Sequence, residues 1–276
     1  MPKFLSQTQV DQFREEGFLA PVDVMSEDDA KLYREKLEAA EQRYPEALNA
    51  ENRNNPHLAF CFLDELAHHP ILLDTVEDLI GPDISLWGSV LFIKEPESPH
   101  YVSWHQDATY MGIKPYDFVT PWIALSPSNL ESGCMSMIPG SHHNHIQKHE
   151  ETFAEDNILT RGQAIADIDE KIAVDLILRP GQMSVHHAEI IHGSRANLSQ
   201  QRRIGYAIQA YMPPPARQVL GDNLWLPVRG KDWHDETSRL TRPQADMEAE
   251  GIKNRQLAND NWANILYQGA ENKRAY

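Results

Sequence analysis

The sequence predicts a mainly β protein in which short antiparallel strands form a sandwich or barrel, with helices at its flanks. Three observations support this fold class. Helical patterns fill the first third of the chain, whereas β-branched and aromatic segments dominate from about residue 83 onward. Turn signals such as Pro139-Gly140 separate these segments. No long helical pattern lies between them, as it would between the strands of a parallel sheet.

The N-terminal part, to about residue 82, predicts a layer of helices. A short helix is expected from Thr8 to Gly17, and a brief strand follows it. Ser26 is the expected N-cap of a second helix that ends near Arg43, because the acidic residues after it face the positive end of the helix dipole. Two further short helices, bounded by Pro70 and Gly81-Pro82, are expected at 58–66 and 71–79.

The rest of the chain predicts a β core and a loop-rich end. The polar stretch from Glu150 to Asp175 is long for a loop, and an insertion of that size is more often a lid than a core element. We expect one domain over 1–276, with the helical layer at about 1–82, the β core at about 83–212 and a loop-rich segment at 213–276. Strands are expected at 84–93, 119–125, 134–138, 182–187 and 204–211.

Charge and cysteine content exclude several classes of function. The chain has 276 residues and a net charge of −16. Because nucleic acids and anionic membranes attract positive charge, we expect neither as a partner. No apolar run is long enough to cross a membrane, and the start lacks the apolar core of a signal peptide. The two cysteines, Cys61 and Cys134, allow no disulfide framework and fit a cytoplasmic location.

The segment Trp104-His105-Gln106-Asp107 carries the strongest chemical signal. In an extended chain, residues i and i+2 point the same way, so His105 and Asp107 can present an imidazole and a carboxylate to one point while Gln106 faces away. His192, which lies between a strand and a glycine, is the candidate for a third ligand. Two histidines and one carboxylate leave three positions of an octahedral metal open, as in non-haem Fe(II) oxygenases.

Arg203 is the candidate for binding an anion. In the expected strand it shares one face with Gly205 and Ala207. A lone arginine among small residues on an inward face is costly unless an anion pairs with it, and a carboxylate can accept two hydrogen bonds from a guanidinium. Arg202 is the alternative, although its side chain is expected on the opposite face.

Other histidines remain alternatives as ligands, since the chain has thirteen. His186 and His187 compete with His192 for the metal, or are satisfied within the sheet. Either a separate metal site or only a polar loop follows the Pro139-Gly140 turn, where three histidines gather: His142, His143 and His145.

Taken together, these segments resemble the phytanoyl-CoA dioxygenase family of Fe(II)- and 2-oxoglutarate-dependent oxygenases. The similarity runs from about residue 17 to 211 and implies a double-stranded β-helix, or jelly-roll, core. It rests on three motifs in the family's order and spacing: His105-Gln106-Asp107; Gly133-Cys134-Met135 with Ile138-Pro139-Gly140-Ser141-His142; and His192-Gly193-Ser194 with Asn197 and Arg203.

The resemblance also implies a role for each matching residue. The iron ligands would be His105, Asp107 and His192. The residues around the distal carboxylate of 2-oxoglutarate would be Arg203, Ser194 and Trp122, and dioxygen would be the other cosubstrate. Candidates for the substrate pocket are Gln106, Tyr110, Lys94 and His142. Halogenating relatives have a small residue in place of the carboxylate, so the presence of Asp107 disfavours halogenation.

The sequence therefore predicts an enzyme that hydroxylates a C–H bond and releases succinate and CO2. Relatives act on acyl-CoA thioesters, osmolytes, secondary metabolites and phosphonates. A net charge of −16 disfavours a polyanionic CoA ester, and we expect a small polar metabolite such as an amino acid or an aminophosphonate. The alternative is a non-oxygenase jelly-roll protein, either a cupin-like metal-dependent isomerase or a binding protein, which would not need Arg203. The oligomeric state stays open.

Overall fold

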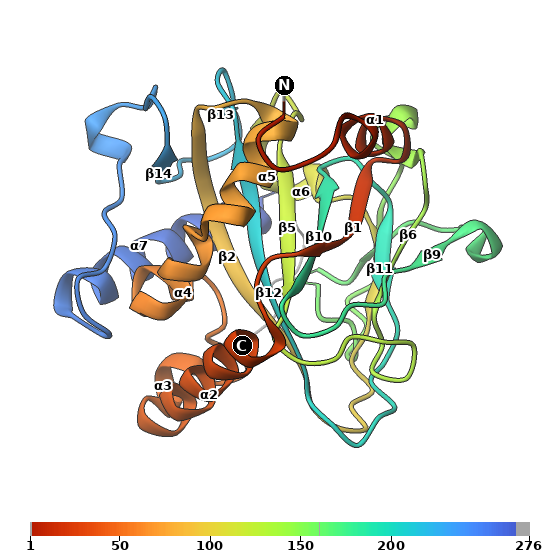
Figure 1. Cartoon of the computed structure of the whole chain (residues 1–276), viewed down its shortest axis with the longest axis horizontal. Helices are drawn as coiled ribbons and strands as arrows, with labels where there is room; N and C mark the ends of the chain where they lie inside the picture. The colour runs from red at the N-terminus through yellow and green to blue at the C-terminus, as the bar shows by residue number, and fades with distance from the viewer. Residues whose placement is uncertain (1, 160, 269–276) are drawn as a thin grey trace.

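Two antiparallel sheets form the centre of the computed structural model, which describes residues 2–159 and 161–268 (Figure 1). The larger sheet has six strands in the order β1-β10-β5-β12-β2-β14, and the smaller sheet has four in the order β3-β11-β6-β9. The prediction of a mainly β protein with flanking helices is confirmed. Two antiparallel sheets of this kind are the architecture of a jelly roll.

The strand bounds lie close to the predicted ones wherever a strand was expected. The large sheet consists of β1 (Phe18–Asp23), β10 (Gln182–His187), β5 (Val119–Ala124), β12 (Arg203–Met212), β2 (Ile84–Lys94) and β14 (Leu226–Arg229). The small sheet consists of β3 (Val102–His105), β11 (His192–Ser194), β6 (Met135–Met137) and β9 (Val174–Asp175). Two small pairs complete the set: β13 (Arg217–Gln218) with β4 (Ile113–Lys114), and β7 (Glu150–Glu151) with β8 (Gln163–Ala164).

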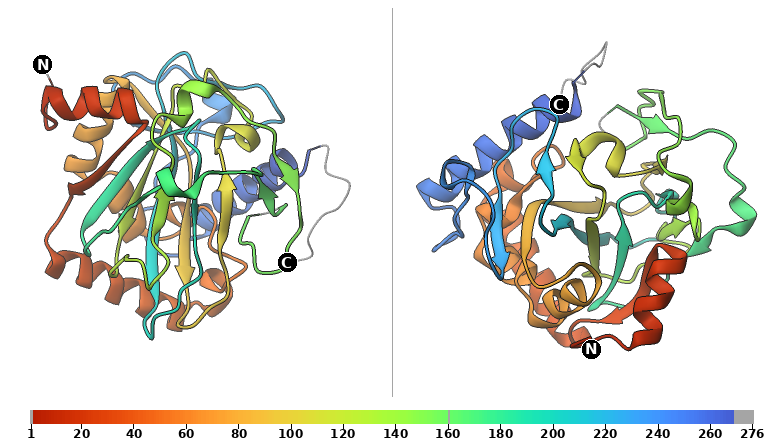
Figure 2. Two further views of the ribbon diagram at one scale, coloured as in Figure 1. Left: turned by 90° about the vertical axis from the view of Figure 1, so that its right-hand side faces the viewer. Right: turned by 90° about the horizontal axis from the view of Figure 1, so that it is seen from above.

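The helices lie mostly against the outer face of the large sheet (Figures 1 and 2). The hydroxyl of Ser26 accepts a hydrogen bond from the Asp29 N–H at 3.1 Å, so the expected N-cap is present. The helices are α1 (Gln7–Glu16), α2 (Glu27–Arg43), α3 (Pro45–Leu48), α4 (Cys61–Ala67), α5 (Pro70–Ile80), α6 (Ala108–Met111) and α7 (Ala249–Leu266). Single 3-10 turns occur at Pro56–Leu58, Ser141–Asn144, Glu170–Ile172 and Glu236–Ser238.

Strand β12 shows how one strand serves two environments. Successive side chains of a strand point to opposite faces of its sheet. The face toward the helices belongs to the main hydrophobic core and carries Ile204, Tyr206 and Ile208. The face toward the small sheet lines a cavity and carries Arg203, Ala207 and Gln209. The same alternation therefore stabilises the fold and supplies the site.

The segment from Glu150 to Asp175 is built from short elements and lies against β3. Its backbone N–H at Ile165 donates to the Trp104 carbonyl oxygen at 2.8 Å. Asn157 and Gln163 line the cavity, so the segment covers part of it.

The prediction of a loop-rich C-terminal segment is wrong for the part that forms α7, a regular helix of 18 residues, whereas residues 213–248 are mostly loops. Its buried residues recur every three or four positions and are Gly251, Arg255, Ala258, Trp262 and Ile265. A glycine and an arginine stand at two of these buried positions. The buried face of α7 is therefore not a continuous apolar face, so the hydrophobic periodicity that usually predicts a helix is missing from its sequence. None of the described helices is long and apolar enough to cross a membrane.

Arg255 links α7 to the segment that precedes the 3-10 turn Pro56–Leu58. Its guanidinium donates hydrogen bonds to three backbone carbonyl oxygens, those of Ala47, Asn52 and Asn54. The side chain is 7% exposed. Backbone carbonyl groups need hydrogen-bond donors, and this one side chain supplies the donors for three of them between residues 47 and 54.

We expect Arg255→Ala to lower the free energy of unfolding by about 2–4 kcal/mol, since three partly buried hydrogen bonds from a charged donor are lost. Urea denaturation measures the change. Lys253→Ala, at an exposed position of the same helix, is the matched control and should change stability by less than about 0.5 kcal/mol. Equal effects of the two substitutions would show that Arg255 does not anchor the loop.

Candidate metal centre and cofactor pocket

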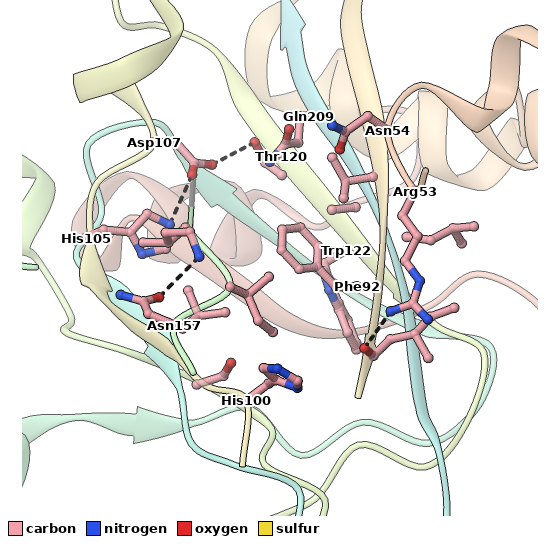
Figure 3. Close-up of a pocket in the computed structure, with 18 of the residues that line it drawn as sticks. Arg53, Asn54, Phe92, His100, His105, Asp107, Thr120, Trp122, Asn157 and Gln209 are labelled. Carbon is pink, nitrogen blue, oxygen red and sulfur yellow. Dashed lines mark hydrogen bonds and ion pairs between the residues drawn. The ribbon is translucent and has the colours of Figure 1, made fainter. Parts of the chain in front are cut away.

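Three buried side chains from separate parts of the chain meet at one point. The ligand atoms of His105, Asp107 and His192 all lie within 4.8 Å of one another. Asp107 Oδ1 is 3.4 Å from His105 Nε2 and 3.8 Å from His192 Nε2. Figure 3 shows His105 and Asp107 turned toward each other at one wall of the cavity. Within residues 2–159 and 161–268, this is the only group of three such ligands with metal-binding spacing.

Strand pairing brings the two histidines together. His192 at the start of β11 lies directly opposite His105 at the end of β3 in the antiparallel register. Gly193 permits this approach, because a Cβ atom there would lie 2.9 Å from the carbonyl oxygen of Val102. The metal centre is therefore a product of the small sheet.

Asp107 reaches the site by a turn and not along an extended strand. Strand β3 ends at His105, and Asp107 has helical dihedral angles (φ −57°, ψ −41°) as the N-cap of α6. The prediction that His105 and Asp107 lie on one face of an extended segment is thus wrong, because the segment is not extended at Asp107. Their side chains converge because the chain turns back after Gln106.

Backbone carbonyl groups fix the tautomer of both histidines. His105 Nδ1 lies 2.9 Å from the Ser103 carbonyl oxygen, and His192 Nδ1 lies 3.1 Å from that of Ile190. Because a carbonyl oxygen only accepts, each Nδ1 carries the proton and each Nε2 keeps a lone pair for a metal. Burial, followed by repulsion from His105 and His186, lowers the pKa of His192 well below its ordinary value. His192 is therefore neutral, as a metal ligand must be.

Two further side chains hold the other oxygen of Asp107. Its Oδ2 atom lies 3.3 Å from His186 Nε2 and 3.3 Å from the hydroxyl of Thr120. Burial alone would raise the pKa of Asp107, but its interactions with the neighbouring histidines outweigh that effect and lower the pKa well below its ordinary value. The carboxylate is thus ionised, with Oδ1 directed toward the two histidines.

Arg203 lies buried on the cavity side of β12, with 2% of its surface exposed. Its Nη1 donates to the Gly133 carbonyl oxygen at 2.7 Å, while its Nε has no partner. The guanidinium carbon is 5.2 Å from the centre of the Trp122 ring. That ring lies over Gly205, where any Cβ atom would overlap it. Burial lowers the pKa of Arg203 to about 10, so the group is still charged at neutral pH.

Lys94 is a second buried basic group beside Arg203. The two residues are direct partners across β2 and β12, which places their Cβ atoms about 5 Å apart. Lys94 Nζ donates to the Ser194 hydroxyl at 2.8 Å and to the Arg195 carbonyl oxygen. Burial, and then repulsion from Arg203, lowers the pKa of Lys94 to about 6. In the described part of the chain no carboxylate pairs with either cation, and this arrangement favours a bound anion.

The alternative assignments from the sequence are settled by contacts elsewhere. Arg202 faces the other way and forms ion pairs with Glu41 at 2.8 Å and Glu95 at 2.9 Å. His187 contacts His142 and not the metal ligands. Its neighbour His186 does reach the centre, but as a partner of Asp107.

Three expected pocket residues, Gln106, His142 and Lys94, do not line the cavity, and their substrate assignment is corrected. Gln106 is fully buried and its amide group bonds the backbone of His145, Glu189 and Gln147, so it joins loops. His142 packs on a neighbouring histidine and bonds the Arg14 carbonyl oxygen at 3.1 Å. Together with His143 and His145 it forms no ligand group among the described residues.

The metal ligands, Arg203 and Trp122 line one cavity of about 900 Å³. Tyr110 lines it as expected. Sequence reasoning missed other residues of its wall, namely Thr120, Gln209, Trp87, Trp262 and Asn54. Thr120 could have been predicted from the alternation of strand side chains, because it shares a face of β5 with Trp122. Trp262 could not have been predicted, since its helix was not expected.

Comparisons with known proteins agree with this geometry. The family described as phytanoyl-CoA dioxygenase (PhyH) matches residues 2–205. The chain is 31% identical over 183 residues to a probable alpha-ketoglutarate-dependent hypophosphite dioxygenase of Stutzerimonas stutzeri, with 64% of each protein covered. It is 30% identical over 136 residues to the peroxisomal phytanoyl-CoA dioxygenase of Homo sapiens, over 48% of this chain and 40% of that protein. The matched part thus spans less than two thirds of these curated relatives.

A solved structure matches over nearly the whole chain. The apo form of the non-heme monooxygenase ThoJ aligns with a TM-score of 0.83 and 30% identity, over 94% of this chain and 98% of that one. A complex of ThoJ with nickel aligns with a TM-score of 0.77. The expected jelly-roll fold is confirmed. Since the family match covers most of the chain, the protein belongs to the phytanoyl-CoA dioxygenase family.

Proposed function

We propose that this protein is an Fe(II)- and 2-oxoglutarate-dependent dioxygenase that hydroxylates a C–H bond of a small molecule. One observation carries the proposal: a buried His-Asp-His set and the buried guanidinium of Arg203, which no carboxylate of the described residues pairs, line the same cavity. The first group suits a metal and the second suits a carboxylate. A keto acid that must reach both is the ligand that this combination favours.

The donor set fits iron. Two neutral imidazoles and one ionised carboxylate are the ligands of non-haem Fe(II) oxygenases, and they leave positions for cosubstrates. His105, Asp107 and His192 would hold the metal. Two relatives support the same cofactors: one is named an alpha-ketoglutarate-dependent dioxygenase, and another, a non-heme monooxygenase, was solved with nickel.

The cation pair fits the distal carboxylate of 2-oxoglutarate. Arg203 offers an Nε–H that has no partner, and Lys94 and the Ser194 hydroxyl lie beside it. Trp122 would limit the cosubstrate on one side, because its ring is fixed between Arg203 and Gly205. Lys94, expected near the substrate, would therefore serve the cosubstrate.

Each part of the site then has a task. Bound Fe(II) and 2-oxoglutarate supply the activation of dioxygen, with succinate and CO2 as products, and the oxidation of the C–H bond. His186 and Thr120 hold Asp107 so that one of its oxygens is directed to the metal position. Asn157 and Gln163 of the covering segment would help to exclude water.

The alternative, a non-oxygenase jelly-roll isomerase or binding protein, is not favoured. Nothing in such a reaction requires an arginine buried without a counter-charge, and burying one costs stability. Family membership points the same way. The cytoplasmic location and the lack of a nucleic-acid partner, expected from composition, stay predictions.

The residues of the site restrict the class of substrate less than they restrict the type of reaction. An amino acid or aminophosphonate, favoured by the sequence, would occupy a small part of a cavity of about 900 Å³. A CoA thioester would bring several negative charges past Glu51 and Glu155, which are exposed at the cavity. A screen of succinate release across amino acids, aminophosphonates, osmolytes, secondary metabolites and acyl-CoA thioesters tests the class directly.

The metal assignment is tested by Asp107→Ala. The wild-type protein should develop a visible charge-transfer band when Fe(II) and 2-oxoglutarate are added without oxygen, and should release succinate slowly in air without substrate. Asp107→Ala should weaken metal affinity by more than about tenfold and abolish both signals. Asp117→Ala, at an exposed position outside the cavity, is the matched control.

Wild-type rates in Asp107→Ala would show that the ligand assignment is wrong. A wild-type protein that gives neither the band nor succinate would favour the non-oxygenase alternative.

The lowered pKa of Lys94 predicts a pH dependence of 2-oxoglutarate binding. Lys94 has a pKa of about 6 in the empty site, and a bound dicarboxylate stabilises its charged form and raises that pKa. Binding above pH 6 therefore takes up a proton, and affinity should fall with rising pH by up to about tenfold per unit. Below pH 6 the lysine is already charged and this slope disappears.

Calorimetric titration of the zinc-loaded protein with 2-oxoglutarate from pH 5.5 to 8.5 measures the effect. Lys94→Met should bind more weakly and without the slope, whereas Lys171→Met at an exposed position should behave as wild type. A slope that persists in Lys94→Met would assign it to another group.

A further inference from the structure

The cavity has a second region that the cosubstrate residues do not use. Tyr110 follows Asp107 closely, on α6, and Trp262 lies on α7, which packs against α6. Both side chains line the cavity. Gln209 and Asn54 line it as well, and Figure 3 shows them near Thr120 at one end of the pocket, while His100 lies at the other end.

Two buried polar atoms in this region lack partners. Tyr110 is 8% exposed and Trp262 is 2% exposed. Neither the Tyr110 hydroxyl nor the Trp262 indole N–H has a hydrogen-bond partner in the described part of the chain. Buried polar groups are rarely left unpaired. An indole N–H can only donate and a phenol can donate, so an acceptor would satisfy both.

The charged side chains of the cavity lie elsewhere or are already paired. Arg53 donates to the Ile93 carbonyl oxygen and pairs with Glu95 at 3.5 Å. Glu51 and Glu155 are exposed. The guanidinium of Arg161 lies 5.8 Å from the centre of the Tyr110 ring, but it pairs with Glu151 at 2.8 Å, and neither residue lines the cavity. Burial raises the pKa of Tyr110, which keeps it neutral. A charged group bound here would find no unpaired counter-charge in the lining of this region apart from the metal centre.

Apart from Thr120, Gln209 and Asn54, the remaining wall of this region is apolar. The rings of Trp87 and Trp262 stack with their centres 4.1 Å apart and an angle of 18° between their planes. Val90, Met111 and Leu266 line the same cavity. Water contacts apolar surface of this kind unfavourably, and an apolar part of a ligand that covers the surface removes that contact.

From these contacts we propose that the region recognises an uncharged, largely apolar substrate through a hydrogen-bond acceptor, such as a carbonyl oxygen, which the Tyr110 hydroxyl and the Trp262 N–H bind. The inference rests on the proposed function and names its substrate class. It replaces the small polar metabolite expected from the sequence. Because α7 lies outside the residues matched by the family, Trp262 makes this specificity a property of the chain's own C-terminal segment.

Three matched probes test the class. The probes are 2-phenylacetamide, phenylacetate and phenethylamine, which share one apolar ring and differ in charge. Ligand-observed NMR titration of the zinc-loaded protein, saturated with 2-oxoglutarate so that the cation pair is occupied, gives each Kd. We expect the neutral amide to bind at least about tenfold more tightly than either charged probe. Tighter binding of a charged probe would overturn the inference.

Two variants test the residues. Trp262→Phe and Tyr110→Phe each remove one donor and keep the ring, and each should raise the Kd of the amide about fivefold, the loss expected for one hydrogen bond. Trp233→Phe removes an indole N–H that bonds the Ala216 carbonyl oxygen outside the cavity, and should leave that Kd unchanged. Wild-type affinity in both variants would overturn the assignment. The order of the three probes needs no variant, so a variant that misfolds does not remove the test.

The oxygenase function and the substrate class can be refuted independently of each other. The charge-transfer band with Fe(II) and 2-oxoglutarate is recorded on the same preparations. A normal band without preference for the amide would overturn the substrate class and leave the oxygenase function standing. Absence of the band would overturn the oxygenase function, whatever the probes show.

Discussion

The register of β11 against β3 is the constraint on which the metal centre depends. His192 lies opposite His105 only in this register, and a shift by one residue would turn one of the two imidazoles to the other face of the sheet. Pairing of β11 with β6 on its other side fixes the same register a second time. Gly193 lets the strands approach closely. A short strand of three residues thus determines whether a metal can bind.

A second constraint is the cost of burying charge. Arg203 and Lys94 lie side by side without a carboxylate among the described residues, which opposes folding. The same strands offset this cost on their other face, where Ile204 and Ile93 join the main hydrophobic core. The large sheet therefore has a stabilising face and a functional face. The unpaired cations make the site ready for a dicarboxylate without rearrangement.

Periodic patterns made much of the fold predictable. The capped helix after Ser26 and the strand that carries Arg203 follow from local rules, since capping and alternation act within a few residues. Helix α7 escaped prediction because Gly251 and Arg255 occupy its buried face. Their burial makes sense only beside the partner: the backbone of Leu58 and Ala59 leaves no room for a Cβ atom at Gly251, and the loop carbonyl groups need the guanidinium of Arg255.

The sequence by itself determined the chemical identity of the site, because the residue types and order of the His-x-Asp motif, His192 and Arg203 are properties of the chain alone. Only the tertiary structure decided which neighbours act with them. Lys94 lies beside Arg203 through strand pairing, His186 on β10 contacts Asp107, and Trp262 comes from the far end of the chain. Such contacts join residues far apart in sequence, and no local pattern encodes them.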